Sequence, residues 1–217
     1  MGELPLLDTI AAEVRTEQEV SRSRFIATLA PVADLDAVGE VVARVRREFH
    51  DASHHCTALV LGPDGQQQRS NDDGEPAGTA GAPMLAVLRG AELTDVVAVV
   101  TRHFGGTLLG AGGLVRAYGG AVSAACDRAR RLARRWVTVV RIDVPLADAG
   151  RIEHLLHRFT ADVGIPLEPG AYTADGATFH LAVPDGGAMD HLEQLLAVEG
   201  LPRSVERLRR EVRDVAR

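Results

Sequence analysis

Two arginines flank a glycine-rich stretch in the middle of the chain, and together they could bind an anion. Arg102 precedes this stretch and Arg116 lies near its end, and its glycines include Gly105, Gly106, Gly112 and Gly113. A strand that turns through glycines into a helix exposes free backbone N–H groups at the positive end of the helix dipole. Guanidinium groups add fork-shaped donors suited to phosphate or carboxylate. The stretch lacks the last glycine of the dinucleotide motif and the lysine of the P-loop. Its glycines therefore equally suit tight packing of a strand against a helix.

Three carboxylates lie close together in an earlier glycine-containing segment: Asp72, Asp73 and Glu75. Such a group could bind a hard cation or act as acid and base. The run Asn-Asp-Asp-Gly is also ordinary turn sequence and lacks the alternating spacing of a calcium loop. A third interpretation is that these acids pair with Arg102 or Arg116 and hold the two glycine segments together. Thr79 is a candidate N-cap for the helix expected after this segment.

Histidines and a cysteine offer weaker candidates for chemistry. His50 and His54 have the i, i+4 spacing that zinc ligands often use, but residues 53–56 are expected to leave the helix for a strand. Cys56 beside His55 makes a poor nucleophile pair, because neighbouring strand residues point to opposite faces. The chain has no Gly-x-Ser-x-Gly elbow. We therefore predict no catalytic residues, no metal site and no cofactor.

The composition limits the partners that the protein can have. The chain has 217 residues, 46% of them hydrophobic, a net charge of −6 and basic residues that are all arginine. Because the sequence has no lysine, a Schiff-base lysine and a lysine-dependent phosphate loop are excluded. Without a large basic field, contact with nucleic acid requires a local arginine patch. The five arginines at positions 128, 130, 131, 134 and 135 could touch a phosphate backbone or form the solvated end of a helix. With 4% aromatic residues, a base-stacking platform has little support.

The cysteine count and the hydropathy predict a cytoplasmic protein. Two cysteines and no charged-then-apolar leader indicate a reducing compartment. No apolar run approaches the roughly 20 residues of a membrane span, so we expect no membrane contact. The sequence leaves the oligomeric state open.

Hydrophobic periodicity predicts an α+β protein of two domains, residues 1–135 and 136–217. In the first domain we expect strands at residues 9–19, 23–32, 55–62 and 95–101, and helices at 34–49, 80–89 and 111–133. In the second we expect strands at 137–144, 167–173 and 177–183 and helices at 148–162 and 187–199. Residues 204–215 suit a helix by their apolar spacing and a strand by the symmetry of the domain. The order βαββαβ is that of a ferredoxin-like sandwich.

The motifs resemble the signature of the YigZ/IMPACT family. The resemblance is carried by residues 52–58 (ASHHCTA), 72–85 (DDGEPAGTAGAPML), 101–106 (TRHFGG) and 110–118 (GAGGLVRAY), and it extends over roughly residues 20–130. One departure is visible: His103 stands where a tyrosine is usual, which changes the hydrogen-bonding chemistry of that position.

The resemblance implies more than the residues alone. It implies an N-terminal domain like the second domain of the fifth small-subunit ribosomal protein, with a mixed sheet and two helices on one face. It also implies a C-terminal domain similar to those of elongation factor G. Eukaryotic members carry a further partner-binding module and dampen a starvation-responsive kinase pathway that controls translation initiation. That module has no counterpart in this sequence.

These observations predict a non-enzymatic protein that binds RNA or the translation machinery, including the ribosome or its factors. The predicted anion site uses Arg102, Arg116 and the amides of Gly105, Gly106, Gly112 and Gly113, with Phe104 and Tyr118 as its walls. Asp73, Glu75 and Thr79 are expected to support it. The alternative is an enzyme or sensor for a small phosphorylated or carboxylated metabolite, in which Asp73 or Glu75 holds a divalent ion or serves as base.

Overall fold

The computed structural model describes residues 6–198, 200 and 205–216. The chain divides into two compact units, Met1–Ala133 and Arg134–Arg217, which we describe separately. Glu199 and Ser204, at the ends of two expected segments, lie outside the described residues.

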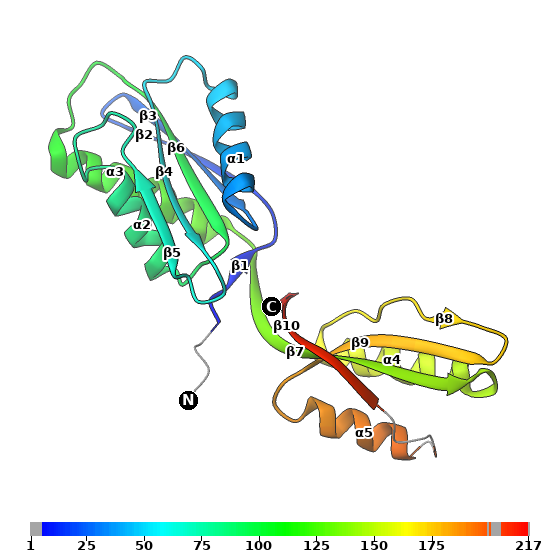
Figure 1. Ribbon diagram of the computed structural model, residues 1–217. Helices are drawn as coiled ribbons and strands as arrows, with labels where there is room; N and C mark the ends of the chain where they lie inside the picture. Colours follow the sequence, from blue (N-terminus) through cyan, green and yellow to red (C-terminus); the bar gives the residue numbers. More distant parts are fainter. Residues whose placement is uncertain (1–5, 199, 201–204, 217) are drawn as a thin grey trace. The chain divides into compact units, whose positions relative to one another are not determined.

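The first unit is built on one antiparallel sheet, shown in Figure 1. Its strand order is β2-β3-β6-β4-β5. The strands are β2 (Val14–Val20), β3 (Ser23–Pro31), β4 (His54–Leu61), β5 (Gln67–Asn71) and β6 (Val96–His103). Each neighbouring pair is antiparallel, which corrects the mixed sheet that the family resemblance implied. Strand β5 escaped prediction because every residue in it is polar and exposed, as the edge of a sheet permits.

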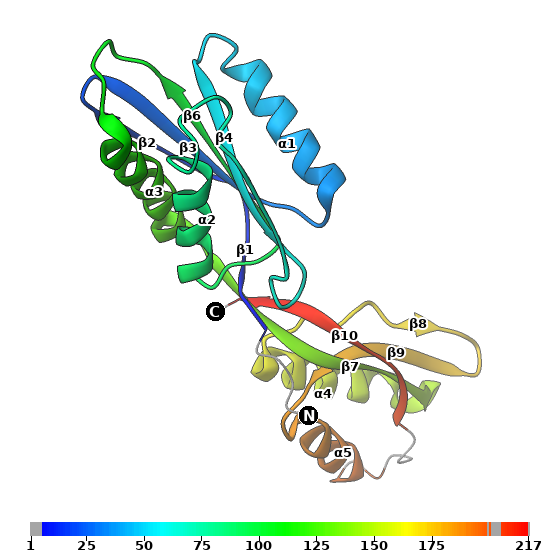
Figure 2. The ribbon, with the colours of Figure 1, turned by 60° about the vertical axis from the view of Figure 1, so that its left-hand side comes forward.

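Helices cover both faces of this sheet. Helices α2 (Gly81–Gly90) and α3 (Gly110–Arg128) pack on one face, and α1 (Leu35–Glu48) packs on the other (Figures 1 and 2). The central strands are apolar on both sides: Ala98 and Val100 of β6 face α2 and α3, whereas Val97 and Val99 face α1. The unbroken apolar run in β6 follows from this double burial.

Helix α3 ends earlier than the sequence predicts. It stops at Arg128, and the chain enters strand β7 (Arg131–Pro145) instead of continuing in helix to residue 133. The first residues of β7 pair with β1 (Thr9–Ile10), with Arg131 opposite Ile10. Because Ile10 is 2% exposed, burial of this strand pair outweighs the helical propensity of the arginine-rich run. The arginines at 131, 134 and 135 therefore lie on a strand and not at a helix end.

The second unit has the expected βαββαβ order. After β7 come the 3₁₀ turn Leu146–Asp148, α4 (Ala149–Val163), β8 (Ala171–Tyr172), β9 (Gly176–Pro184), α5 (Ala188–Val198) and β10 (Val205–Ala216). The strands lie in the order β10-β7-β9-β8. The ambiguous last segment is thus a strand, because its pairing with β7 completes the sheet. Apolar residues of α4 and α5, such as Ile152, Phe159 and Leu192, pack on β7 and β9.

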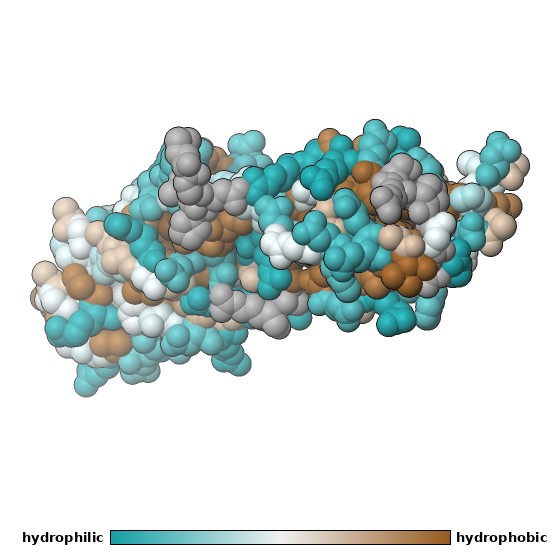
Figure 3. Space-filling model, turned by 90° about the horizontal axis from the view of Figure 1, so that it is seen from below, coloured by the Kyte–Doolittle hydropathy of each residue, from teal (hydrophilic) through white to brown (hydrophobic). Residues whose placement is uncertain are grey.

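None of the described helices is long and apolar enough to cross a bilayer. Hydrophilic and hydrophobic residues are interspersed over the face shown in Figure 3.

Candidate functional site

The amino terminus of α3 is an exposed part of the glycine-rich stretch. Its N-cap residue, Leu109, makes no side-chain capping bond, and the first turn holds no acidic residue. The N–H groups of the first helical residues have no partner within an α-helix, so those of Gly110, Ala111 and Gly112 are free to meet an anion. Gly110 has a φ of +69°, which favours glycine at the point where the chain enters the helix.

Arg116 lies against this first turn. Its Nη1 is 3.6 Å from the position that a Cβ on Gly112 would occupy. The side chain is exposed, and no ion pair of Arg116 is found among the described residues. The guanidinium and the positive end of the helix dipole therefore reinforce each other at one place.

A pocket of about 370 Å³ opens beside this helix end. Its apolar walls include Phe104, Leu108, Leu109 and Leu114, and its polar lining is formed by His54, Glu75 and Arg102. Phe104 is 49% exposed and Leu108 is 88% exposed. These two side chains come from the loop between β6 and α3, which carries them to the surface.

A buried ion pair lies in the lining of the pocket. Arg102 Nη1 donates to Glu75 Oε1 at 2.6 Å, and the side chains are 6% and 3% exposed. The hydroxyl of Tyr118 donates to the same oxygen at 2.7 Å. Burial, with Cys56 and Glu75 nearby, raises the pKa of Tyr118, so the phenol stays a donor. The pairing expected between an acid of the first segment and Arg102 is present, and it ties the two glycine segments together.

Arg102 is also held between aromatic rings. Its Cζ lies 5.5 Å from the ring centroids of both Phe25 and Phe104. Its Nη2 donates to Ser23 Oγ at 3.4 Å, while Nε is buried and has no hydrogen-bond partner among the described residues. An unsatisfied buried donor costs about 1–3 kcal/mol. Arg102 is thus mainly an internal residue, with one donor that the surrounding protein does not satisfy.

The two aspartates beside Glu75 are occupied by backbone amides. Asp72 Oδ1 accepts from the N–H groups of Ala80 and Gly81, and its Oδ2 accepts from Gly78. Asp72 therefore caps α2. Thr79, the expected cap, instead donates its hydroxyl to the carbonyl of Pro76 at 2.6 Å, because the folded loop carries the Asp72 carboxylate to the helix end.

Asp73 joins three parts of the first unit. Its Oδ1 accepts from Arg46 Nη2 at 2.5 Å and its Oδ2 from the backbone N–H of His55 at 2.7 Å. Burial favours the neutral acid, but Arg46 and the His55 amide outweigh it and lower the pKa of Asp73. Both oxygens are used in this way, which leaves Glu75 as the acidic residue at the pocket.

The histidines and Cys56 separate onto the two faces of the sheet. His54 Nδ1 donates to the carbonyl of Asp73 at 2.8 Å, and its Nε2 lies 3.9 Å from Glu75 Oε1. His55 Nδ1 contacts Thr101 Oγ1 at 3.1 Å, and burial lowers its pKa. Cys56 is buried, which raises the pKa of its thiol to about 12. Helix α1 ends before His50, so His50 and His54 do not share a helix, and no metal-binding cluster occurs in the described part of the chain.

His103, the residue that departs from the family pattern, belongs to the other side of the sheet. Its ring packs edge-on against Phe49 at 6.3 Å, and its Nδ1 lies 3.7 Å from Asp51 Oδ2. It does not line the pocket.

The glycines named by the sequence have different roles. A Cβ on Gly105 would lie 1.9 Å from the carbonyl oxygen of Arg22, so this glycine permits close packing against the turn between β2 and β3. The amide of Gly105 donates to Ser23 Oγ. Gly106 has a φ of +79° and nothing within 4 Å of its Cβ position. A Cβ added to Gly113 would lie 2.9 Å from the Cβ of Leu109, so this glycine permits close packing against Leu109.

Sequence reasoning missed some residues that shape the site. Ser23, Leu108, Leu109 and Leu114 were not singled out, because each comes from an ordinary strand, loop or helix pattern. The capping function of Asp72 was also missed. The exposed leucine in a glycine-rich loop was the one local signal that could have revealed the apolar wall.

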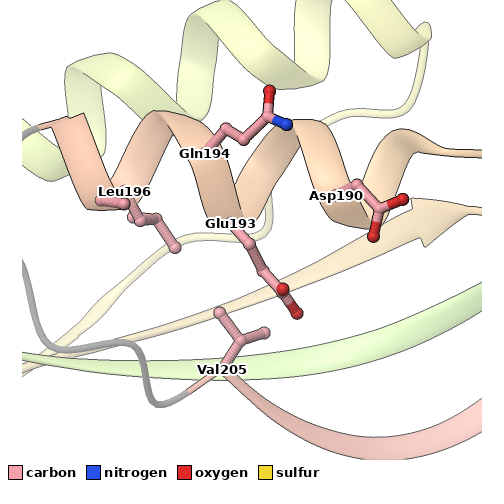
Figure 4. Close-up of a pocket in the computed structure, with 6 residues that line it drawn as sticks. Asp190, Glu193, Gln194, Leu196 and Val205 are labelled. Carbon is pink, nitrogen blue, oxygen red and sulfur yellow. The ribbon is translucent and has the colours of Figure 1, made fainter.

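A second hollow, in the second unit, suits an anion less well. It has a volume of about 450 Å³ and lies between α5 and β10 (Figure 4). Among the described residues, its lining includes Asp190 and Glu193 and no basic side chain. Glu193 is also 3.6 Å from Arg207. We therefore place the candidate site in the first unit.

Comparisons with known proteins decide the family. Residues 21–126 match the Impact N-terminal domain. The chain is 53% identical over 117 residues to IMPACT family member YigZ of Escherichia coli, covering 53% of this chain and 57% of that protein. It is 38% identical over 169 residues to an IMPACT family member of Thermus thermophilus, covering 77% of this chain and 88% of that protein. The chain belongs to the IMPACT family.

One solved structure is similar to this chain over nearly its whole length. A crystal structure of a hypothetical protein shares 34% sequence identity with this chain and superposes with a TM-score of 0.59, over 95% of this chain and 99% of the other. The match to the Escherichia coli member of the IMPACT family spans little more than half of that protein's length.

Proposed function

We propose that this IMPACT family protein is a non-enzymatic binding protein that acts on RNA or the translation machinery in the cytoplasm. The observation that carries the proposal is the uncapped, glycine-rich start of α3 with Arg116 folded over it. Free amides, a helix dipole and an exposed guanidinium converge there, and a phosphate oxygen satisfies all three. The functions implied by the family resemblance point to translation.

The proposed site differs from the arrangement first expected in the role of Arg102. Because Arg102 is buried against Glu75, we assign it to holding the site together. The anion then contacts Arg116 and the free amides of Gly110, Ala111 and Gly112. The amide of Gly105 already donates to Ser23, and in the α-helical pattern that of Gly113 bonds back to Leu109. Gly106 gives the loop its left-handed turn.

The domain arrangement supports the same proposal. We infer that the second unit is ferredoxin-like and similar to domains of elongation factor G, because it combines the order βαββαβ with strands arranged β10-β7-β9-β8. A shared fold gives only general support, because one fold can host many functions. The α3 site therefore carries the proposal.

The test is the salt dependence of RNA binding. Fluorescence anisotropy with a labelled single-stranded RNA, at several salt concentrations, should show weaker binding for Arg116→Ala. The slope of log K against log salt should become shallower by about 0.7 for one lost phosphate contact. Arg47→Ala is the matched control, since this exposed arginine lies on α1, on the opposite face of the sheet. Equal slopes for wild type and Arg116→Ala would contradict the proposal.

A second candidate function is an enzyme or sensor for a small anionic metabolite. It is favoured by one observation, the buried Glu75 carboxylate with His54 in the lining of the pocket. A thermal-shift screen of phosphorylated and carboxylated metabolites, with and without magnesium, separates the two candidates. A hit that Glu75→Gln abolishes favours the metabolite, whereas a silent screen beside ribosome co-sedimentation favours the translation machinery. At 100 times its dissociation constant a ligand adds about 2.7 kcal/mol of stability.

A further inference from the structure

The pocket beside α3 combines a polar floor, an exposed aromatic wall and, at its mouth, the amino-terminal end of α3. We propose that it binds one nucleotide unit, with the base inside the pocket and the phosphate at the start of α3. This inference rests on the proposed function and names the ligand of the same site. The volume of the pocket, about 370 Å³, falls in the range of small-molecule pockets.

The floor presents hydrogen-bond acceptors to a ligand. Glu75 Oε1 is taken by Arg102 and Tyr118, whereas Oε2 has no hydrogen-bond partner among the described residues. His54 donates through Nδ1, so its Nε2 is an acceptor in the neutral ring. Carboxylates accept from the N–H groups of nucleobases. The base that fits this floor best is guanine, which offers adjacent N–H donors, and the base that fits it worst is uracil, whose single donor lies between two carbonyl oxygens.

Arg102 gives the floor an unsatisfied donor as well. It is 5% exposed and lines the pocket, and its Nε lacks a partner among the described residues. A small rotation of this guanidinium toward an acceptor on the ligand would supply that partner. Buried polar groups without partners are uncommon in native proteins, so this donor is an observation independent of the helix end.

The wall suits a flat ring. The Arg102 guanidinium carbon lies 5.5 Å from the ring centroid of Phe104, and Phe104 is 49% exposed. Its exposed surface is available for stacking, which stabilises single-stranded nucleic acids on proteins whatever the base. Leu108 and Leu109 extend the apolar wall. Exclusion of water by these side chains strengthens hydrogen bonds at the floor.

The mouth suits the phosphate. Gly110 and Ala111 line the pocket at the start of α3. Arg116 is not one of the lining residues, but it lies one helical turn after Gly112, with Nη1 3.6 Å from the Cβ position of that glycine. The absence of a Cβ at Gly112 lets an oxygen approach the backbone. A free mononucleotide and an unpaired nucleotide of an RNA chain present the same base and phosphate. The experiment below separates these two sources.

The test measures binding of GMP, UMP and a single-stranded, guanine-containing RNA to the full chain by titration calorimetry. We expect GMP to bind more tightly than UMP. Phe104→Ala should weaken GMP and RNA binding by about tenfold through lost stacking, and Phe104→Trp should restore it. Tyr172→Ala is the control, because Tyr172 is a half-exposed aromatic residue of the second unit. Thermal unfolding of each variant shows whether it is folded.

The outcomes are distinct. RNA binding much tighter than GMP binding identifies an RNA chain as the source, and equal affinities identify a free nucleotide. Binding of RNA that depends on Arg116 but not on Phe104 overturns the base pocket and leaves the proposed function standing. Absence of RNA binding by the wild type overturns both the inference and RNA as the target in the proposed function. Binding of a peptide with an apolar C-terminal residue, with no binding of GMP, assigns the pocket to a protein partner and also overturns the inference.

Discussion

Removing Arg102 should destabilise the first unit far more than removing Arg116. Arg102→Ala leaves the Glu75 carboxylate, whose side chain is 3% exposed, without its guanidinium partner 2.6 Å away. Breaking a buried ion pair by deleting one partner costs about 3–5 kcal/mol of unfolding free energy. For a unit of this size, the corresponding fall in Tm is on the order of 15 °C. Arg116→Ala removes only an exposed side chain and should change stability by less than about 0.5 kcal/mol.

The assay is urea unfolding followed by two signals. Far-UV circular dichroism reports on both units, whereas fluorescence of Trp136, which belongs to the second unit, serves as an internal reference. The Arg102→Ala transition should move to lower urea in circular dichroism, with a smaller change in Trp136 fluorescence. A double-mutant cycle with Glu75→Gln should give a coupling free energy above about 1 kcal/mol. A loss below about 1 kcal/mol for Arg102→Ala would refute the argument and return Arg102 to the candidates for ligand contact.

Three further predictions concern the same unit. Gly105→Ala should lower the free energy of unfolding in urea by more than about 2 kcal/mol, because the added Cβ would lie 1.9 Å from a backbone oxygen. Gly39→Ala is the control: its Cβ would stand in open space on α1, so the free energy of unfolding should stay the same or rise. Gly112→Ala should add about 0.5–1 kcal/mol of stability but weaken RNA binding in anisotropy, and unchanged binding would show that no anion approaches that backbone. The pKa of Asp72 is lowered by amides of Gly78, Ala80 and Gly81 despite partial burial. Wild-type stability should therefore fall as pH drops below about 4, and Asp72→Ala, itself about 1–2 kcal/mol less stable near neutral pH, should show a flatter pH profile in thermal unfolding.

The sequence determined much of the framework. Apolar periodicity located helices α1, α4 and α5, and the unbroken apolar run identified β6 as a central strand. The order of the motifs identified the family, and the pairing of an acid with Arg102 was among the interpretations that it offered. Patterns of this kind are local, since they depend on which residues along one segment must be buried.

Other features depended on contacts between distant segments, which no local pattern encodes. Pairing with β1 ends α3 at Arg128 and begins β7, and β10 became a strand through its pairing with β7. Arg102 and Arg116 look alike in the sequence, but Arg102 is buried against Glu75 and Arg116 is exposed at the surface. The tertiary structure made this distinction because a charge is stable in the interior only where the fold supplies its partner.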